Sequence, residues 1–189
     1  MEKTVEQIFA ESVAVKQETL KKNLPAIVQS AQSIIEAFQN NHKLFFCGNG
    51  GSAADSQHIA AEFVGRFQKE RKAWPAIALT TDTSALTALG NDYSFDIVFS
   101  RQLEALGQKG DVLVGISTSG NSKNVIEAVK KAKTLGIKTI GVTGGNGGQL
   151  ASLCDIALVA ASTKTARIQE AHLCIFHSIC ELVENALTK

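Results

Sequence analysis

Residues 44–53 read Leu-Phe-Phe-Cys-Gly-Asn-Gly-Gly-Ser-Ala and join an apolar segment to a glycine-rich turn and the start of a helix. The segment is apolar at every position, as in a strand that is covered on both faces. Four further strand-length apolar segments follow at 76–79, 112–116, 139–142 and 156–160. Helical patterns separate most of them, at 52–70, 94–107, 121–135 and 148–153. This alternation predicts an α/β fold with a single doubly wound, parallel, five-stranded sheet.

Both ends of the chain also have helical patterns. The stretches 5–20 and 24–38 predict two helices, because Pro25 suits the first turn of a second helix. A terminal helix is expected from about residue 166 to residue 187. We therefore expect a single domain over 1–189, with a helical extension over 1–40 and the α/β core and C-terminal helix over 41–189.

The composition excludes several classes of function. Lys and Arg total 19, and Asp and Glu total 18. The net charge of +1 is too small to favour binding to a nucleic acid or to an anionic membrane. No apolar run is long enough to cross a bilayer. The N-terminal residues lack the pattern of a signal peptide, which predicts a cytoplasmic protein. The four cysteines show no Cys-x-x-Cys spacing and lie in apolar segments, which indicates reduced core thiols.

The glycine-rich turn at 48–53 has two interpretations. Gly48, Gly50 and Ala53 match the dinucleotide-binding pattern, with Ser52 as a helix N-cap. The acidic residue which that pattern requires corresponds to Asp82, farther along the chain than usual. A nicotinamide-dependent oxidoreductase is therefore one hypothesis, and a tight turn without a ligand is the other.

A second loop, Gly-Ile-Ser-Thr-Ser-Gly-Asn-Ser at 115–122, also precedes a helix. Its hydroxyl groups and the free N–H groups at the helix start form donors for a phosphate dianion without Lys or Arg. A simple serine N-cap is the alternative. A single phosphate site favours a small phosphorylated metabolite over a nucleotide.

Candidate acid, base and metal-binding residues lie on two predicted helices. His58 and Glu62 are four residues apart and share a face, which suits an exposed ion pair, a metal site or an acid–base pair. The C-terminal helix places His172 and His177 among apolar residues, where a core histidine is the alternative to a functional one.

Five motifs together resemble the phosphoheptose isomerases, a family of sugar isomerase (SIS) fold. They are Cys-Gly-Asn-Gly-Gly-Ser at 47–52, His-Ile-Ala-Ala-Glu at 58–62, Gly-Asn-Asp at 90–92, the serine loop at 115–122 and Arg-Ile-Gln-Glu-Ala-His at 167–172. The resemblance covers nearly the whole chain.

The resemblance implies an enzyme that converts sedoheptulose 7-phosphate to D-glycero-D-manno-heptose 7-phosphate through an enediolate, for lipopolysaccharide core or surface glycan synthesis. It implies Glu62 and His177 as the catalytic acid–base pair. It also implies a homotetramer with active sites at subunit interfaces and no nucleic-acid or membrane partner. The implied substrate-binding residues are Asn49, Gly50, Gly51, Ser52, Glu62, Asn91, Asp92, Ser117, Thr118, Ser119, Ser122 and Gln169.

The same resemblance implies one Zn²⁺ per subunit, bound by His58, Glu62, Gln169 and His177. Gln169 and His177 are eight residues apart, about 12 Å along a straight helix, which is at the limit for two ligands of one ion. A contribution from His172 or from a second subunit therefore stays open. Whether the metal is catalytic or structural also stays open, because Glu62 cannot readily be both a firm zinc ligand and a free base.

A non-catalytic relative is the alternative function. The segment Ala-Ala-Asp-Ser-Gln at 53–57 resembles a tetrameric interaction protein, the bacterial replication-initiator-associating protein. That family lacks the acid and the late histidine that match Glu62 and His177. Because both are present here, the enzyme is favoured.

Overall fold

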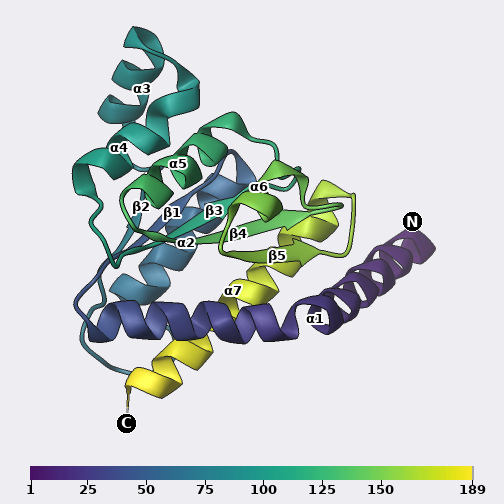
Figure 1. Ribbon diagram of the computed structural model, residues 1–189. Helices are drawn as coiled ribbons and strands as arrows, with labels where there is room; N and C mark the ends of the chain where they lie inside the picture. The colour runs from purple at the N-terminus through teal and green to yellow at the C-terminus, as the bar shows by residue number, and fades with distance from the viewer. Residues whose placement is uncertain (189) are drawn as a thin grey trace.

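Five parallel strands form the sheet at the centre of the fold (Figure 1). The computed structural model describes residues 1–188. The strands are β1 (Leu44–Cys47), β2 (Ala76–Ala78), β3 (Val112–Ile116), β4 (Lys138–Gly144) and β5 (Ile156–Ala160). Their order is β2-β1-β3-β4-β5, and each neighbouring pair is parallel. The predicted parallel, five-stranded sheet is confirmed.

The strand order reverses between β1 and β3. From β1 the chain crosses to β2 at the edge and then returns to the other side of β1 as β3. The register pairs Cys47 with Gly115, so the loops that follow β1 and β3 leave the sheet side by side. In open α/β sheets such a reversal leaves a crevice for ligands at the carboxyl ends of the strands. The glycine turn and the serine loop both lie there.

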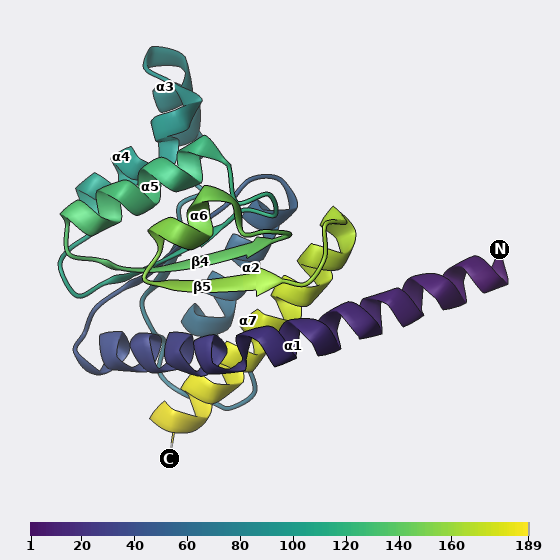
Figure 2. The same cartoon turned by 45° about the vertical axis from the view of Figure 1, so that its right-hand side comes forward.

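Seven α-helices and one 3₁₀ turn, η1, surround the sheet among the described residues (Figures 1 and 2). One face packs against α1, α2 and α7, and the other face packs against α4, α5 and α6. Leu44 and Phe46 of β1 face the first group, whereas Phe45 and Cys47 face the second. The helix bounds are α1 (Glu2–Gln39), α2 (Gly51–Val64), α3 (Thr83–Asp92), η1 (Phe95–Ile97), α4 (Val98–Leu106), α5 (Lys123–Thr134), α6 (Gly148–Leu153) and α7 (Thr165–Leu187).

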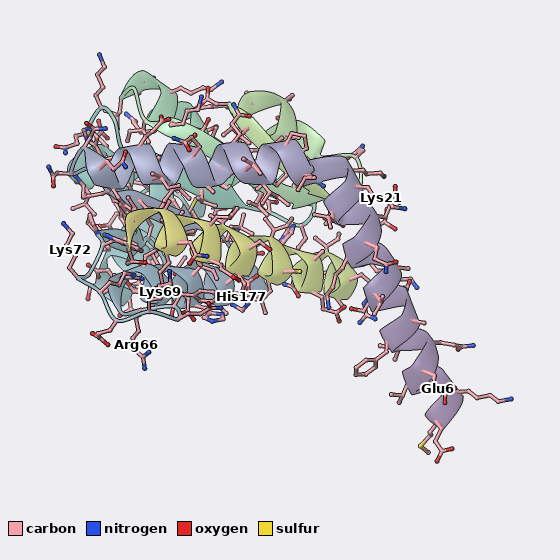
Figure 3. The ribbon with its side chains drawn as sticks, turned by 90° about the horizontal axis from the view of Figure 1, so that it is seen from below. Glu6, Lys21, Arg66, Lys69, Lys72 and His177 are labelled. Atoms are coloured by element: carbon pink, nitrogen blue, oxygen red, sulfur yellow. The ribbon has the colours of Figure 1, made fainter. Side chains whose placement is uncertain are left out.

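The prediction of two N-terminal helices is wrong, because α1 is one helix with Pro25 inside it. Figure 3 shows the helix bending near Lys21. Proline has no N–H for the carbonyl of Lys21, four residues earlier, and its ring crowds that carbonyl, so the helix bends there. Asn23 and Ile27, on either side of Pro25, are both buried. Packing on both sides of the bend therefore keeps one helix continuous.

Two other helix predictions differ from the structure, and one helix of the structure has no predicted counterpart. The helix after β1 ends at Val64, before Gly65, and its N-cap is Gly50 with φ +56°, so Ser52 is not the cap. The predicted helix over 94–107 is η1 followed by α4. Helix α3 was not predicted, and Asp82 begins it by accepting a hydrogen bond from the N–H of Ala85. The acidic residue of the dinucleotide pattern is thus a helix cap.

The cysteines differ in exposure, and all four are free thiols. Cys47 and Cys180 are buried, whereas Cys174 is exposed, so the expectation of a core thiol is wrong for Cys174. Burial raises the pKa of Cys180 to about 12. Among residues 1–188, none of the helices combines the length and the apolar character that a membrane span requires.

Strand β5 lies at one edge of the sheet, and α1 covers its outer backbone groups. The side chain of Asn23 donates to the carbonyl of Val159 at 3.0 Å and accepts from its N–H at 2.8 Å. The hydroxyl of Thr19 accepts from the N–H of Ala161 at 3.0 Å. Asn23 and Thr19 thus occupy the positions that backbone groups of a further strand would take.

We expect Asn23→Ala to destabilise the fold, because it leaves two backbone groups of Val159 without partners. Leaving a buried polar group without its hydrogen-bond partner lowers the free energy of unfolding by about 1–3 kcal/mol. Urea unfolding followed by circular dichroism measures this. The control is Gln32→Ala, which removes an exposed side-chain pair with Glu36 on the same helix. Equal unfolding midpoints for the two variants would contradict this role of Asn23.

Candidate active site

A reciprocal pair of amides joins the two loops at the switch point. Asn49, after β1, donates to the side chain of Asn124 at 2.9 Å, and Asn124 donates back at 2.8 Å. Asn124 is buried in the first turn of α5 and also accepts from the N–H of Val125. The predicted substrate residue Asn49 is therefore held in place by a residue that the sequence did not single out.

The serine loop folds so that its hydroxyl groups converge. Oγ of Ser117 lies 2.9 Å from Oγ of Ser122 and 3.5 Å from Oγ of Ser119. Gly120 adopts φ +67°, and a Cβ at this position would collide with the carbonyl of Gly147. The first turn of α5 follows directly, and its N–H groups face outward from the helix start. The arrangement matches a donor site for a phosphate dianion.

Helices α2 and α7 run in the same direction along one face of the sheet. At their starts, the amide of Gln169 lies so close to Gly51 that any Cβ at Gly51 would collide with it. Farther along, His58 lies opposite His177, with ring centroids 5.3 Å apart. This parallel alignment places the glycine turn, Gln169 and the two histidines along the contact between α2 and α7, which is called the seam below.

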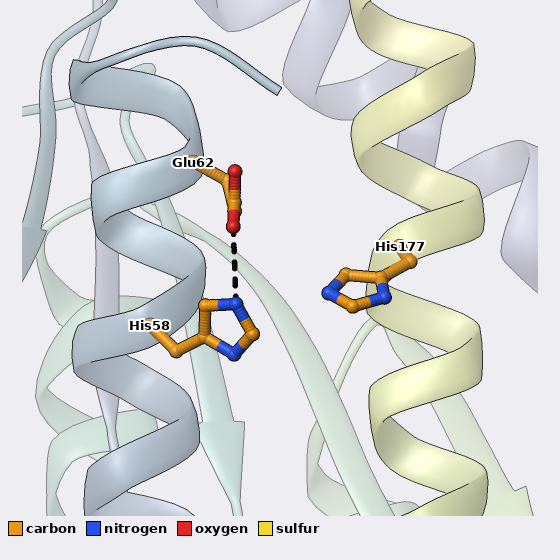
Figure 4. Close-up of side chains that lie close together, drawn as sticks. All are labelled: His58, Glu62 and His177. Atoms are coloured by element: carbon orange, nitrogen blue, oxygen red, sulfur yellow. Dashed lines mark hydrogen bonds and ion pairs between the residues drawn. The ribbon is translucent and has the colours of Figure 1, made fainter. Parts of the chain in front are cut away.

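His58, Glu62 and His177 form a cluster on that seam (Figure 4). Nε2 of His58 lies 3.0 Å from Oε1 of Glu62, and one ligand atom from each of the three residues lies within 4.8 Å of the others. The ring of His177 faces the other two side chains, and its Nε2 is buried without a hydrogen-bond partner among the described residues. An orphaned imidazole nitrogen beside a second imidazole and a carboxylate fits a divalent metal ion, and this donor set suits zinc.

The other predicted metal ligand, Gln169, lies elsewhere on the seam within one chain. Its amide packs on Gly51, which is seven residues, or about 10 Å along α2, from His58. The structure therefore brings together three of the four predicted metal ligands. Gln169 instead lies beside the predicted substrate residues of the glycine turn.

His172 is a core histidine and does not replace a ligand. It is fully buried, and its Nε2 lies 2.9 Å from the carbonyl oxygen of Thr143. Burial lowers the pKa of His172 to about 4, although the hydrogen bond with Thr143 acts in the opposite direction. The imidazole is therefore neutral at physiological pH, and its Nε2 is already engaged.

Asn91 and Asp92 lie away from the cluster within one chain. They are exposed at the end of α3, where the amide of Asn91 donates to Asp92 at 2.9 Å. Helix α3 packs on η1 and α4 and projects from the opposite end of the molecule from α7 (Figures 1 and 2). The structure does not bring this pair to the metal cluster of the same chain.

A buried ion pair that no sequence pattern indicated lies next to the cluster. Arg71 and Glu184 lie 3.1 Å apart, with side chains only 3% and 2% exposed. Arg71 stands in the charged segment 66–72, where its neighbours Lys69, Glu70 and Lys72 are exposed. No signal in that segment separates Arg71 from a solvated charge.

Comparisons with known proteins agree with this geometry. The model of the SIS domain family matches residues 7–144. The chain is 53% identical over 183 residues to the phosphoheptose isomerase of Aliarcobacter butzleri, covering 97% of this chain and 93% of the relative. It is 60% identical over 152 residues to that of a Nitratiruptor species, covering 80% and 81% of the two chains.

Solved structures give the same result. The phosphoheptose isomerase of Neisseria gonorrhoeae superposes with a TM-score of 0.92 at 49% identity, covering 97% of this chain and 98% of that one. A phosphoheptose isomerase from Francisella tularensis gives a TM-score of 0.93 at 39% identity, with 97% of both chains covered. The chain therefore belongs to the SIS domain family and, within it, to the phosphoheptose isomerases.

Proposed function

We propose that this chain is an aldose–ketose isomerase that converts sedoheptulose 7-phosphate to D-glycero-D-manno-heptose 7-phosphate. The observation that carries the proposal is a phosphate-type donor loop that leaves the sheet beside the glycine turn, together with a carboxylate and two imidazoles on α2 and α7. Family membership supports the same reaction, since the relatives at 53% and 60% identity are named phosphoheptose isomerases. The alternative of a non-catalytic interaction protein is not favoured.

Phosphate binding is assigned to Ser117, Thr118, Ser119 and Ser122, together with the N–H groups at the start of α5. Helix N-termini favour anions because their first N–H groups have no partner within the helix. The sugar hydroxyls are assigned to Asn49, Gly50, Gly51, Ser52 and Gln169.

Proton transfer is assigned to Glu62 and His177. Glu62 removes a proton from C1 of the ketose to give the enediolate, and the same carboxyl group returns a proton to C2 to give the aldose. His177 moves a proton at the substrate oxygens, since a neutral imidazole has one donor nitrogen and one acceptor nitrogen. Oε1 of Glu62 faces His58, and among residues 1–188 no hydrogen bond reaches its Oε2. That second oxygen is the proposed proton acceptor.

Zinc is the proposed cofactor, one ion per subunit, held by His58, Glu62 and His177, with Gln169 as a fourth predicted ligand. When bound, the ion would polarise the carbonyl oxygen of the substrate as a Lewis acid. The residues of the chain itself position the sugar, bind its phosphate and carry its protons.

A homotetramer with active sites between subunits is the proposed assembly, in the cytoplasm and without a membrane or nucleic-acid partner. The N-terminal half of α1 exposes a group of apolar side chains: Val5, Ile8, Phe9 and Val13. Such a stripe suits contact with a second copy. Asn91 and Asp92, which project away from the cluster of their own chain, would then contact substrate in a neighbouring subunit.

We expect the purified, zinc-supplied protein to convert sedoheptulose 7-phosphate to an aldose phosphate without a nicotinamide cofactor. ¹H NMR detects the anomeric proton of the product directly. A folded tetramer that binds zinc but forms no product would instead support the interaction-protein alternative.

Ser119→Ala and Ser122→Ala should weaken substrate binding more than turnover. Each loses a hydrogen bond to a charged phosphate, worth about 1.5–3 kcal/mol, so KM should rise at least about tenfold. Steady-state kinetics separate KM from kcat. The control is Ser152→Ala in α6, whose hydroxyl binds only the carbonyl of Gln149. Unchanged KM in both loop variants would exclude the serine loop as the phosphate anchor.

Glu62→Gln should reduce turnover by about 10²–10⁴-fold with little change in substrate affinity, because it removes the base and keeps the size. His177→Gln should reduce turnover to a similar extent. The turnover of the double variant should fall by less than the product of the two single-variant factors. Product formed in deuterium oxide should carry deuterium at C2. The control is Glu181→Gln, an exposed carboxylate on α7. Near-normal turnover in Glu62→Gln would assign the base to another group.

A further inference from the structure

Glu184 is a buried carboxylate two turns after His177 on α7. Its two oxygens accept hydrogen bonds from the N–H groups of Phe67, Gln68 and Lys69, at 3.1, 2.8 and 2.9 Å. Burial alone would raise the pKa of Glu184, but these hydrogen bonds and the one from Arg71 outweigh it and lower the pKa below its ordinary value. The carboxylate is therefore ionised at neutral pH, and it fixes the turn that follows α2.

Arg71 binds the end of α2 from the same turn. Its guanidinium donates to the carbonyl of Glu62 at 2.7 Å, of Phe63 at 2.9 Å and of Gly65 at 3.1 Å, and its Nε donates to Glu184 at 3.1 Å. The carbonyls in the last turn of a helix have no partner within the helix, so Arg71 caps α2. The ring of Trp74 stacks on the guanidinium at 3.7 Å.

These two side chains form a polar link between α2 and α7, called here the Arg71–Glu184 clamp. One end of the link is the backbone of Glu62, a member of the cluster, and the other end is the helix that carries His177. The turn capped by Glu184 also places the ring of Phe67 beside the ring of His177, with centroids 5.5 Å apart. The clamp therefore contacts α2 at Glu62 and also contacts α7, which carries His177, but its own side chains are not members of the cluster.

Apolar packing alone does not determine the alignment of the two helices. Ile59 and Phe63 of α2 and Phe176 of α7 share one core cluster, but such contacts are not directional. Hydrogen bonds to named carbonyl and N–H groups are directional and define the displacement of one helix along the other. A shared metal ion needs donor atoms placed within a few tenths of an ångström.

We propose that Arg71 and Glu184 are positioning residues, which hold α2 and α7 in the alignment that lets His58, Glu62 and His177 bind one metal ion and transfer protons. This inference rests on the proposed function, and metal binding tests it independently of catalysis. Outer residues that orient ligands typically change metal affinity by about 10–100-fold when they are replaced.

The experiment compares Glu184→Gln and Arg71→Lys with the parent protein. Glu184→Gln replaces an acceptor oxygen with an NH₂ group against backbone N–H groups, and Arg71→Lys keeps the charge but loses the fork that reaches several carbonyls. The matched controls are Glu104→Gln and Arg101→Lys, since these residues form an exposed ion pair at 3.2 Å far from the seam.

Zinc affinity is measured by competition with a chromogenic chelator on the metal-free protein, and circular dichroism checks the fold. We expect both clamp variants to bind zinc at least about tenfold more weakly than the controls. With saturating zinc, kcat should fall while KM changes little, because the serine loop is untouched. The His177 imidazole signals should also shift in NMR spectra of the metal-free protein, which a purely stabilising role would not produce.

Folded clamp variants with zinc affinity within twofold of the parent overturn the proposal. If neither variant folds, Glu184→Asp decides, because it keeps the charge of the clamp but shortens the side chain that reaches Arg71 and the turn after α2. Unchanged zinc affinity in Glu184→Asp then also overturns the proposal. If the parent protein binds zinc but has no isomerase activity, only the proposed function is refuted. If it neither binds zinc nor isomerises the substrate, the proposed function and the role of the clamp are both refuted.

Discussion

The parallel packing of α2 and α7 on one face of the sheet is the constraint on which the site depends. At the start of the pair, Gly51 leaves room for the side-chain amide of Gln169 against the backbone of α2. At the far end, Arg71 and Glu184 connect the helices through buried hydrogen bonds. Between these two contacts, His58 and His177 lie opposite one another. The cluster therefore sits between two points at which the helices touch.

Much of the fold could be predicted from local pattern. A strand such as 112–116, covered on both faces, is apolar at each position, and its bounds agree with the structure. The N-terminal helices were predicted wrongly because the effect of Pro25 depends on what packs around it. Local sequence favours a break, but burial of Asn23 and Ile27 on either side keeps α1 continuous. Helix α3 was missed because all of its residues are exposed or half-buried, so it lacks a strong apolar stripe.

The site was predictable where its parts are close in sequence. The spacing of His58 and Glu62 places them on one face of a helix, and the serine loop carries its hydroxyls within six residues. The remaining parts depend on contacts between distant segments. Asn49 meets Asn124 across 75 residues, and Arg71 meets Glu184 across 113. Whether Gln169 lies beside His177 or beside Gly51 depends on the alignment of two helices, which no short pattern contains.

The cover that α1 places over β5 also limits how copies of this chain can associate. An uncovered edge strand can recruit a strand from another molecule and extend the sheet. Here Asn23 already pairs with the N–H and carbonyl of Val159 in β5, and Thr19 accepts from the N–H of Ala161 just after the strand. The opposite edge, β2, has only three residues and follows Pro75, which has no N–H to offer. Extension of the sheet by strand addition is thus disfavoured at both edges, which leaves the helical surfaces for contacts between copies.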